Sequence, residues 1–81
     1  MGRVSGQQDH HGQLARLGAV IRASRIAIGL SQEALADASG IDRSHMGKIE
    51  RGERNVTFLN IVRIARALGT EPSNLLLKAG L

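Results

Sequence analysis

Residues 31–51, with the sequence SQEALADASGIDRSHMGKIER, contain the pattern that decides the fold. Ser31 offers a side-chain oxygen to cap a short helix that extends to about residue 38. Gly40 follows within a three-residue break, where glycine can take the left-handed conformation that ends a helix. Asp42 then caps a second helix over residues 43–51. This spacing predicts two short helices joined by a tight turn, in which the first helix braces the second.

The side chains of these two helices divide into an inward apolar set and an outward polar set. The apolar set recurs at helical spacing and joins the helices to each other and to a core: Leu35, Ala36, Ile41, Met46 and Ile49. The polar set occupies the opposite face of the second helix: Arg43, Ser44, Gly47, Lys48 and Arg51. Inside a helix Gly47 is about 1 kcal/mol less favourable than alanine. Its presence indicates that another group passes close to it, and DNA is one candidate.

Three more helices are expected around this pair. Apolar residues at three- and four-residue steps predict a first helix that stops before Gly29: Leu14, Leu17, Ile21 and Ile28. A capping threonine and a proline predict the beginnings of two later helices, over residues 57–68 and 72–78. The sequence has no strand pattern, so we expect an all-α fold with five helices in a compact domain over residues 13–81.

The first twelve residues differ in composition from the rest of the chain. Residues 1–12 mix glycine, glutamine and histidine with the lone branched aliphatic residue Val4. Such a segment cannot bury enough apolar surface to offset its chain entropy. We therefore expect residues 1–12 to form a flexible amino-terminal arm.

The composition restricts both the compartment and the partners. The 81-residue chain has room for one domain, and it lacks cysteine and any apolar run of signal-peptide or membrane-span length, so we expect a cytoplasmic protein without membrane association. Its net charge is +4, and basic residues cluster between residues 43 and 66. This clustering favours a polyanion such as duplex DNA, with an acidic protein surface as the alternative. Phe58 is the only aromatic residue, which disfavours the base stacking used in single-strand binding.

Two motifs carry a resemblance to a known family. SQExLAxxxGI (31–41) and SxMxxIExG (44–52) resemble the Xre/Cro-like family of phage-repressor helix-turn-helix proteins, and the similarity extends over about residues 14–77. The segment GERNV (52–56), with the following Asn60-Ile61, resembles the small controller proteins that regulate restriction-modification operons. The resemblance implies a lambda-repressor-like DNA-binding domain. It also implies a sequence-specific transcriptional regulator, of which repressors are an example, with its recognition helix in the major groove of double-stranded DNA.

The same resemblance assigns roles to individual residues. Base-reading positions correspond to Arg43, Ser44 and Lys48, and phosphate-contacting positions correspond to Gln32, His45, Arg51 and Asn55. The family also pairs an arginine late in the first helix with the glutamate that ends the recognition helix, here Arg25 and Glu50. A guanidinium at position 43 can bind guanine O6 and N7 together, which is worth about 1–3 kcal/mol of discrimination. Members often have amide side chains at the first two reading positions, so the positions carry over to this chain but the preferred base does not.

The last third of the chain contains more apolar surface than one small core needs, which predicts a homodimer. The residues expected at the dimer interface are Leu59, Val62, Leu75 and Leu76. Two-fold pairing would place two recognition helices about 34 Å apart, which matches one turn of duplex and a palindromic operator. A monomer with a generously packed core is the alternative.

The sequence lacks a recognisable catalytic or metal-binding constellation. His10, His11 and His45 have no carboxylate or thiol at ligand spacing, and Ser31 and Asp42 are explained as helix caps. We therefore expect no enzyme activity, no cofactor and no small-molecule ligand. Two alternatives remain for the same fold. One is an antitoxin or phage repressor, and the other is a protein-interaction adaptor whose basic face meets an acidic partner.

Overall fold

Five α-helices account for most of the computed structural model, which describes residues 9–81. The helices are α1 (Gln13–Ala27), α2 (Gln32–Ser39), α3 (Arg43–Glu50), α4 (Phe58–Ala67) and α5 (Pro72–Lys78), with no strand in the described range. The predicted all-α class and the five predicted helices are therefore confirmed. Within residues 9–81, no helix is long and apolar enough to cross a membrane.

Short polar side chains begin three of these helices. Ser31, Asp42 and Thr57 each accept a hydrogen bond from the backbone N–H three residues later, at oxygen–nitrogen distances of 3.0, 3.2 and 3.2 Å. These bonds satisfy N–H groups that have no partner within the helix. Gly40 ends α2 with φ at 68°, a conformation that any residue with a side chain adopts only under strain. The tight turn between α2 and α3 therefore follows from local chemistry.

The start of α1 is held by a residue that the sequence analysis placed in the amino-terminal arm. The Asp9 carboxylate accepts hydrogen bonds from the backbone N–H groups of Gln13 and Leu14, both at 2.8 Å. Free N–H groups at a helix start attract a carboxylate, which explains why Asp9 packs with the helical domain. Of the predicted arm over residues 1–12, residues 1–8 lie outside the described residues.

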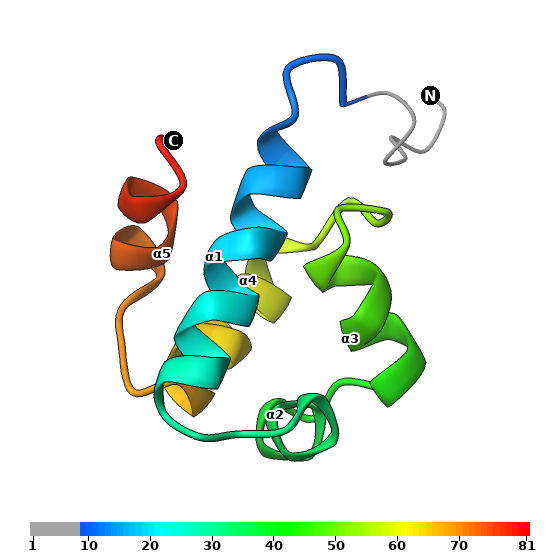
Figure 1. Ribbon diagram of the computed structural model, residues 1–81, viewed down its shortest axis with the longest axis vertical. Coiled ribbons are helices and arrows are strands. Elements are labelled where there is room, and N and C mark those ends of the chain that lie inside the picture. The colour runs from blue at the N-terminus through cyan, green and yellow to red at the C-terminus, as the bar shows by residue number, and fades with distance from the viewer. Residues whose placement is uncertain (1–8) are drawn as a thin grey trace.

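α1 passes through the middle of the molecule and separates α3 from α5 (Figure 1). Both α3 and α5 pack on α1, while α2 packs on α3 and α4, and α4 packs on α5. The α2–α3 pair consequently lies on one side of α1 and α5 lies on the other. Among the helices of residues 9–81, α1 and α2 pack on α3 from its inner side and leave its outer face open.

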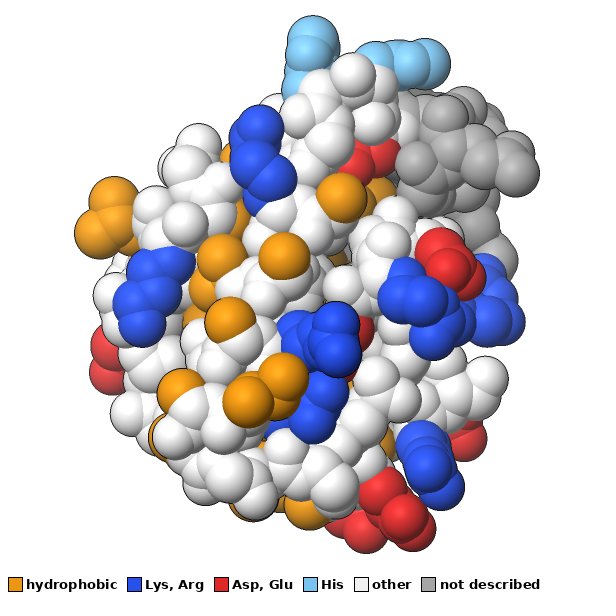
Figure 2. Space-filling view, viewed as in Figure 1, with side chains coloured by type: hydrophobic (Ala, Val, Ile, Leu, Met, Phe, Trp, Pro, Cys, Tyr) orange, Lys and Arg blue, Asp and Glu red, His pale blue; other side chains and the backbone are white. Residues whose placement is uncertain are grey.

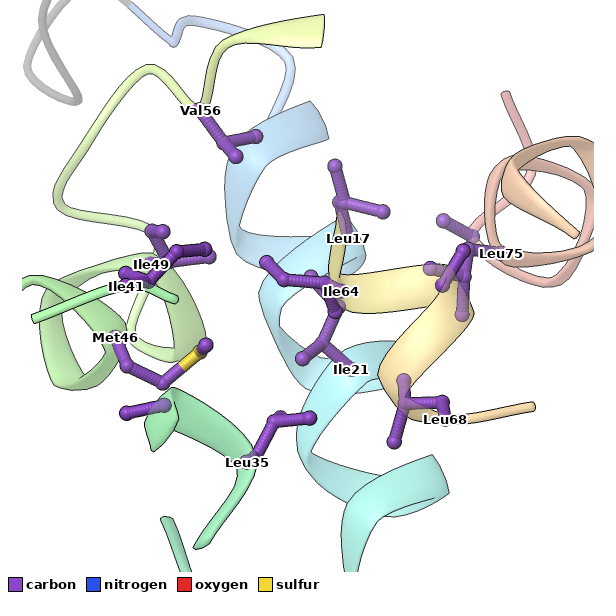
Figure 3. Packing of buried hydrophobic residues seen from close by; sticks show 13 residues of the cluster. Leu17, Ile21, Leu35, Ile41, Met46, Ile49, Val56, Ile64, Leu68 and Leu75 are labelled. Carbon is purple, nitrogen blue, oxygen red and sulfur yellow. The ribbon is translucent and has the colours of Figure 1, made fainter. Parts of the chain in front are cut away.

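Apolar side chains from all five helices meet around α1 (Figure 3). The largest fully buried ones are Ile21, Leu35, Met46, Ile49, Ile64 and Leu75. Ile28, expected on the apolar stripe of the first helix, is 53% exposed because it follows the last helical turn. Leu75 was expected at a dimer interface, and that expectation is wrong. Its side chain is 1% exposed and is enclosed by its own chain, so it cannot contact a second copy.

Gly18 lets α3 approach the backbone of α1. A Cβ at this position would press against the carbonyl oxygen of Ile49 and lie 2.5 Å from that of Glu50. Real Cβ atoms do not tolerate such contacts with backbone, so any larger residue would push the end of α3 away. This close contact fixes the position of α3 on α1.

Candidate nucleic-acid interface

The α2–turn–α3 unit presents a polar face to solvent. On the inner side of α3, Met46 and Ile49 are 0% and 2% exposed. On the outer side, Arg43 and Ser44 are exposed in the first turn, and Lys48 is half-buried one turn later. The three predicted base-reading residues therefore lie on the face of α3 that the core leaves open. In Figure 2, lysine and arginine side chains gather on the side of the molecule where α2 and α3 lie, with acidic side chains among them.

Arg43 is an exposed residue of α3 that lies close to an acidic residue of α2. Its Nη1 atom lies 3.5 Å from Oε2 of Glu33, and the two side chains are 67% and 63% exposed. A single contact of this kind leaves most of the five guanidinium N–H donors available for another acceptor. Arg43 can therefore donate a hydrogen bond to an acceptor outside the protein while it stays close to Glu33.

A buried hydrogen-bond network joins α1, α2 and α3 behind this face. Arg25 donates from Nε to Glu50 Oε2 at 2.8 Å and from Nη2 to Glu50 Oε1 at 3.0 Å, so the ion pair implied by the family resemblance is present. Arg25 also donates from Nη1 to the carbonyl oxygen of Leu30 at 3.0 Å. The hydrogen bond and the charge of Glu50 raise the pKa of Arg25, which keeps the guanidinium protonated.

Glu50 is the centre of this network because its side chain is only 2% exposed. Besides the two bonds from Arg25, its Oε1 accepts a hydrogen bond at 3.1 Å from Nε2 of Gln32, the first residue of α2. A buried carboxylate that accepts several charge-assisted bonds holds its donors in one geometry. The network thereby links the start of α2 and the end of α3 to α1.

The predicted phosphate-contacting residues have different surroundings. Gln32 is half-buried with one amide N–H given to Glu50, and His45 is half-buried as well, whereas Asn55 is exposed. Arg51 is exposed and donates from Nε to Oε2 of Glu53 at 2.7 Å. This hydrogen bond raises the pKa of Arg51 and lowers that of Glu53. The structure therefore brings Gln32 and Arg51 to the α3 side, each already partnered by a glutamate.

Gly47 has an intramolecular explanation that the sequence analysis did not provide. A Cβ there would lie 3.1 Å from Arg51 Nη1 and 3.3 Å from Gln32 Oε1. The groups that pass close to Gly47 in the structure are thus two side chains of the same face. Gly18 was not predicted as a contact point, although its position inside a helix is the same signal as that of Gly47. Glu33 and Glu53, the carboxylate partners of Arg43 and Arg51, were not predicted as ion-pair partners, although they lie in the motifs SQExLAxxxGI and GERNV.

The described residues form no metal-binding cluster, and a surface depression beside α1 lies away from α3. Within residues 9–81, no group of three or more histidine, aspartate or glutamate side chains is arranged to hold a metal ion. A shallow, mostly apolar depression lies between α1 and α5, lined by Val20, Ala23, Ser24, Ala27 and Lys78. It is built from helices on the side of α1 away from the α3 face (Figure 1).

A short helix held at a fixed angle by a second helix, with basic residues on its open face, defines the helix-turn-helix class of DNA-binding proteins. The comparison with known families agrees with this geometry. Residues 21–75 match the helix-turn-helix family HTH_3, and the chain belongs to this family. It is a DNA-binding transcription regulator of the Xre type, as its sequence motifs indicated.

Relatives within the family include control proteins of restriction-modification systems. The control protein C.SmaI of Serratia marcescens is 44% identical over 61 residues, which cover 75% of this chain and 73% of that protein. The crystal structure of the restriction-modification controller protein C.AhdI from Aeromonas hydrophila is 49% identical. The match covers 80% of this chain and 98% of the C.AhdI chain, with a TM-score of 0.78. The clp gene regulator ClgR from Corynebacterium glutamicum is 28% identical, covering 84% and 72% of the two chains with a TM-score of 0.81.

Proposed function

We propose that this protein binds double-stranded DNA sequence-specifically as a homodimer and regulates transcription from a palindromic operator. The observation that carries the proposal is the outer face of α3, where Arg43, Ser44 and Lys48 point away from a core that fixes the helix. An α-helix of this kind fits the major groove, where base edges present distinct donor and acceptor patterns. Because DNA is the proposed target, we also propose that the protein acts in the cytoplasm.

The proposed division of labour follows from side-chain reach and chemistry. Arg43 and Lys48 read base edges and Ser44 adds a weaker contact, because a guanidinium or ammonium group bonds guanine O6 and N7 better than a hydroxyl does. The phosphate contacts are assigned to Gln32, His45, Arg51 and Asn55. Gln32 retains a second amide N–H and a backbone N–H at the start of α2, and helix starts attract phosphate.

The dimer interface is proposed on α4 and α5, away from α3. Leu59 and Leu77 are 64% and 76% exposed, and Val62 and Leu76 are half-buried. Exposed apolar patches on a small domain are a common mark of a protein interface. A two-fold contact there would turn two α3 helices toward the same side of a duplex. Replacing Leu59 and Leu76 together with serine should give a monomer in sedimentation equilibrium, whereas serine at exposed Ile26 of α1 should leave the dimer intact.

The relatives favour a restriction-modification operon as the regulated target. C.SmaI is a control protein and C.AhdI is a restriction-modification controller protein, and the match to C.AhdI spans nearly all of that chain. We therefore propose that this protein controls the expression of a restriction-modification system. Deleting its gene should change transcription of neighbouring endonuclease and methyltransferase genes, and unchanged transcript levels would contradict this assignment.

Selection of duplex fragments tests the proposed DNA recognition. Random duplex fragments are incubated with the full chain at two salt concentrations, and the bound fragments are sequenced. We expect one enriched palindrome and an affinity that falls steeply with salt, because each neutralised phosphate contributes about 0.9 to the slope of log K against log salt. Binding without an enriched sequence, or binding only to an acidic protein, would support the adaptor alternative instead.

A further inference from the structure

We infer that Glu33 is a specificity-determining residue that positions Arg43 for base recognition. The inference rests on the proposed function, because it assigns a partner to the residue proposed to read a base edge. Its starting point is the contact between Arg43 Nη1 and Glu33 Oε2 at 3.5 Å. This ion pair joins the first turn of α2 to the first turn of α3 across the turn between them.

The contact is compatible with simultaneous binding of a base. A guanidinium is planar and carries five N–H donors on different edges, so one edge can face a carboxylate while another bonds an acceptor. Glu33 occupies only the Nη1 corner of Arg43. Guanine O6 and N7 require two parallel donors, which the remaining Nε and Nη2 atoms supply. Glu33 can therefore remain in place when Arg43 enters the groove.

The ordering of Arg43 matters because a long exposed side chain has many rotamers. Binding fixes a free arginine in one rotamer and so costs side-chain entropy. A partner on the same face restricts the rotamers before binding, and less entropy is then lost when the base is bound. A free Arg43 could also turn to the nearest phosphate, which every duplex offers regardless of sequence. By holding Arg43 at its side, Glu33 favours the base contact over the phosphate contact.

A second glutamate on the same face provides a matched control. Arg51 Nε lies 2.7 Å from Glu53 Oε2, and these two side chains are 58% and 53% exposed, compared with 67% and 63% for Arg43 and Glu33. Arg51 is assigned to a phosphate, however, and phosphates are present in specific and non-specific DNA alike. Neutralising Glu53 should therefore strengthen binding to both kinds of DNA by the same factor, whereas neutralising Glu33 should change their ratio.

The test measures affinity for the selected palindrome and for the same duplex with one base pair replaced in each half-site. The replaced base pair is the one at which the Arg43→Ala variant no longer distinguishes the selected base from the others. We expect Glu33→Gln to raise affinity for random duplex and to lower the preference at that pair by about two- to five-fold, the range of an exposed ion pair. Glu33→Asp, which keeps the charge, should retain more of the preference. Glu53→Gln should leave the preference unchanged.

The double variant with Arg43→Ala and Glu33→Gln distinguishes positioning of Arg43 by Glu33 from a general effect of charge or helix stability. In the Arg43→Ala background, Glu33→Gln should no longer change the preference at that base pair, because its effect acts through Arg43. An unchanged preference in Glu33→Gln, or an equal change with and without Arg43, would overturn the inference. If Arg43→Ala itself leaves every base preference intact, the proposed role of Arg43 fails first, so the two failures are distinguishable.

Discussion

Replacing Glu50 with alanine should destabilise the protein strongly, although Glu50 does not face DNA. The substitution removes the acceptor of two hydrogen bonds from Arg25 and one from Gln32. The side chains of Arg25 and Glu50 are 12% and 2% exposed, so the arginine charge would be left largely enclosed. Removing one partner of a buried pair typically costs about 3–5 kcal/mol.

The lower end of that range applies here. Arg25 keeps its bond to the carbonyl oxygen of Leu30 and has some access to water, which together relieve part of the cost. A loss of about 3 kcal/mol is large against the roughly 4–12 kcal/mol expected for a domain of this length. At about 4–8 °C per kcal/mol for a small domain, the melting temperature should fall by about 12–24 °C.

Thermal unfolding followed by circular dichroism measures this loss directly. Glu53→Ala serves as the control, because it removes a glutamate whose ion pair with Arg51 is exposed and should leave the melting temperature close to that of the wild type. DNA binding by Glu50→Ala should weaken even well below its melting temperature, since α2 and α3 lose their common anchor. If Glu50→Ala has the same melting temperature as the wild type, the buried network does not stabilise the fold.

Three further outcomes are expected. Gly18→Ala should destabilise the fold by about 1–3 kcal/mol in urea titrations, because its Cβ meets α3 backbone; equal stability would show that α1 and α3 can separate freely. Gly47→Ala should not be destabilising, since the flexible ends of Arg51 and Gln32 can shift and alanine favours the helix; a loss of more than about 1 kcal/mol would contradict this. In Arg51→Ala, the pKa of Glu53 in an NMR titration should rise toward its ordinary value, and an unchanged pKa would exclude the ion pair. Because Arg51 lowers this pKa in the folded protein, any stabilisation by the pair is present above the ordinary glutamate pKa and is lost as pH falls through the lowered one.

The parts of the fold that could be predicted depend on residues close in sequence. Ser31, Asp42 and Thr57 cap helices through bonds to backbone three residues away, and Gly40 ends α2 by its own conformational freedom. Such signals are local, so the sequence contains them without any knowledge of packing. Helical spacing of apolar residues supplied most of the core in the same way.

The parts that sequence could not predict depend on how the helices meet. Leu75 and Leu77 are both leucines of α5, but only packing decides that one is enclosed and the other exposed. Gly18 was visible as a glycine inside a helix, yet the backbone it faces lies more than thirty residues further along the chain. The pairing of Glu33 with Arg43 likewise arises from the angle between α2 and α3. That angle is a tertiary property, so no local pattern specifies it.

Recognition of base pairs by the open face of α3 is tested most directly by comparing Arg43→Ala with Arg63→Ala. Both arginines are exposed, but Arg63 lies on α4 outside the proposed interface. Affinities are measured for the selected duplex and for every single base-pair replacement in one half-site. Arg43→Ala should lose about 1–3 kcal/mol of discrimination at one base pair, while Arg63→Ala keeps the wild-type preferences. If Arg43→Ala keeps the preference at every position, α3 does not read DNA through Arg43 and the account is contradicted.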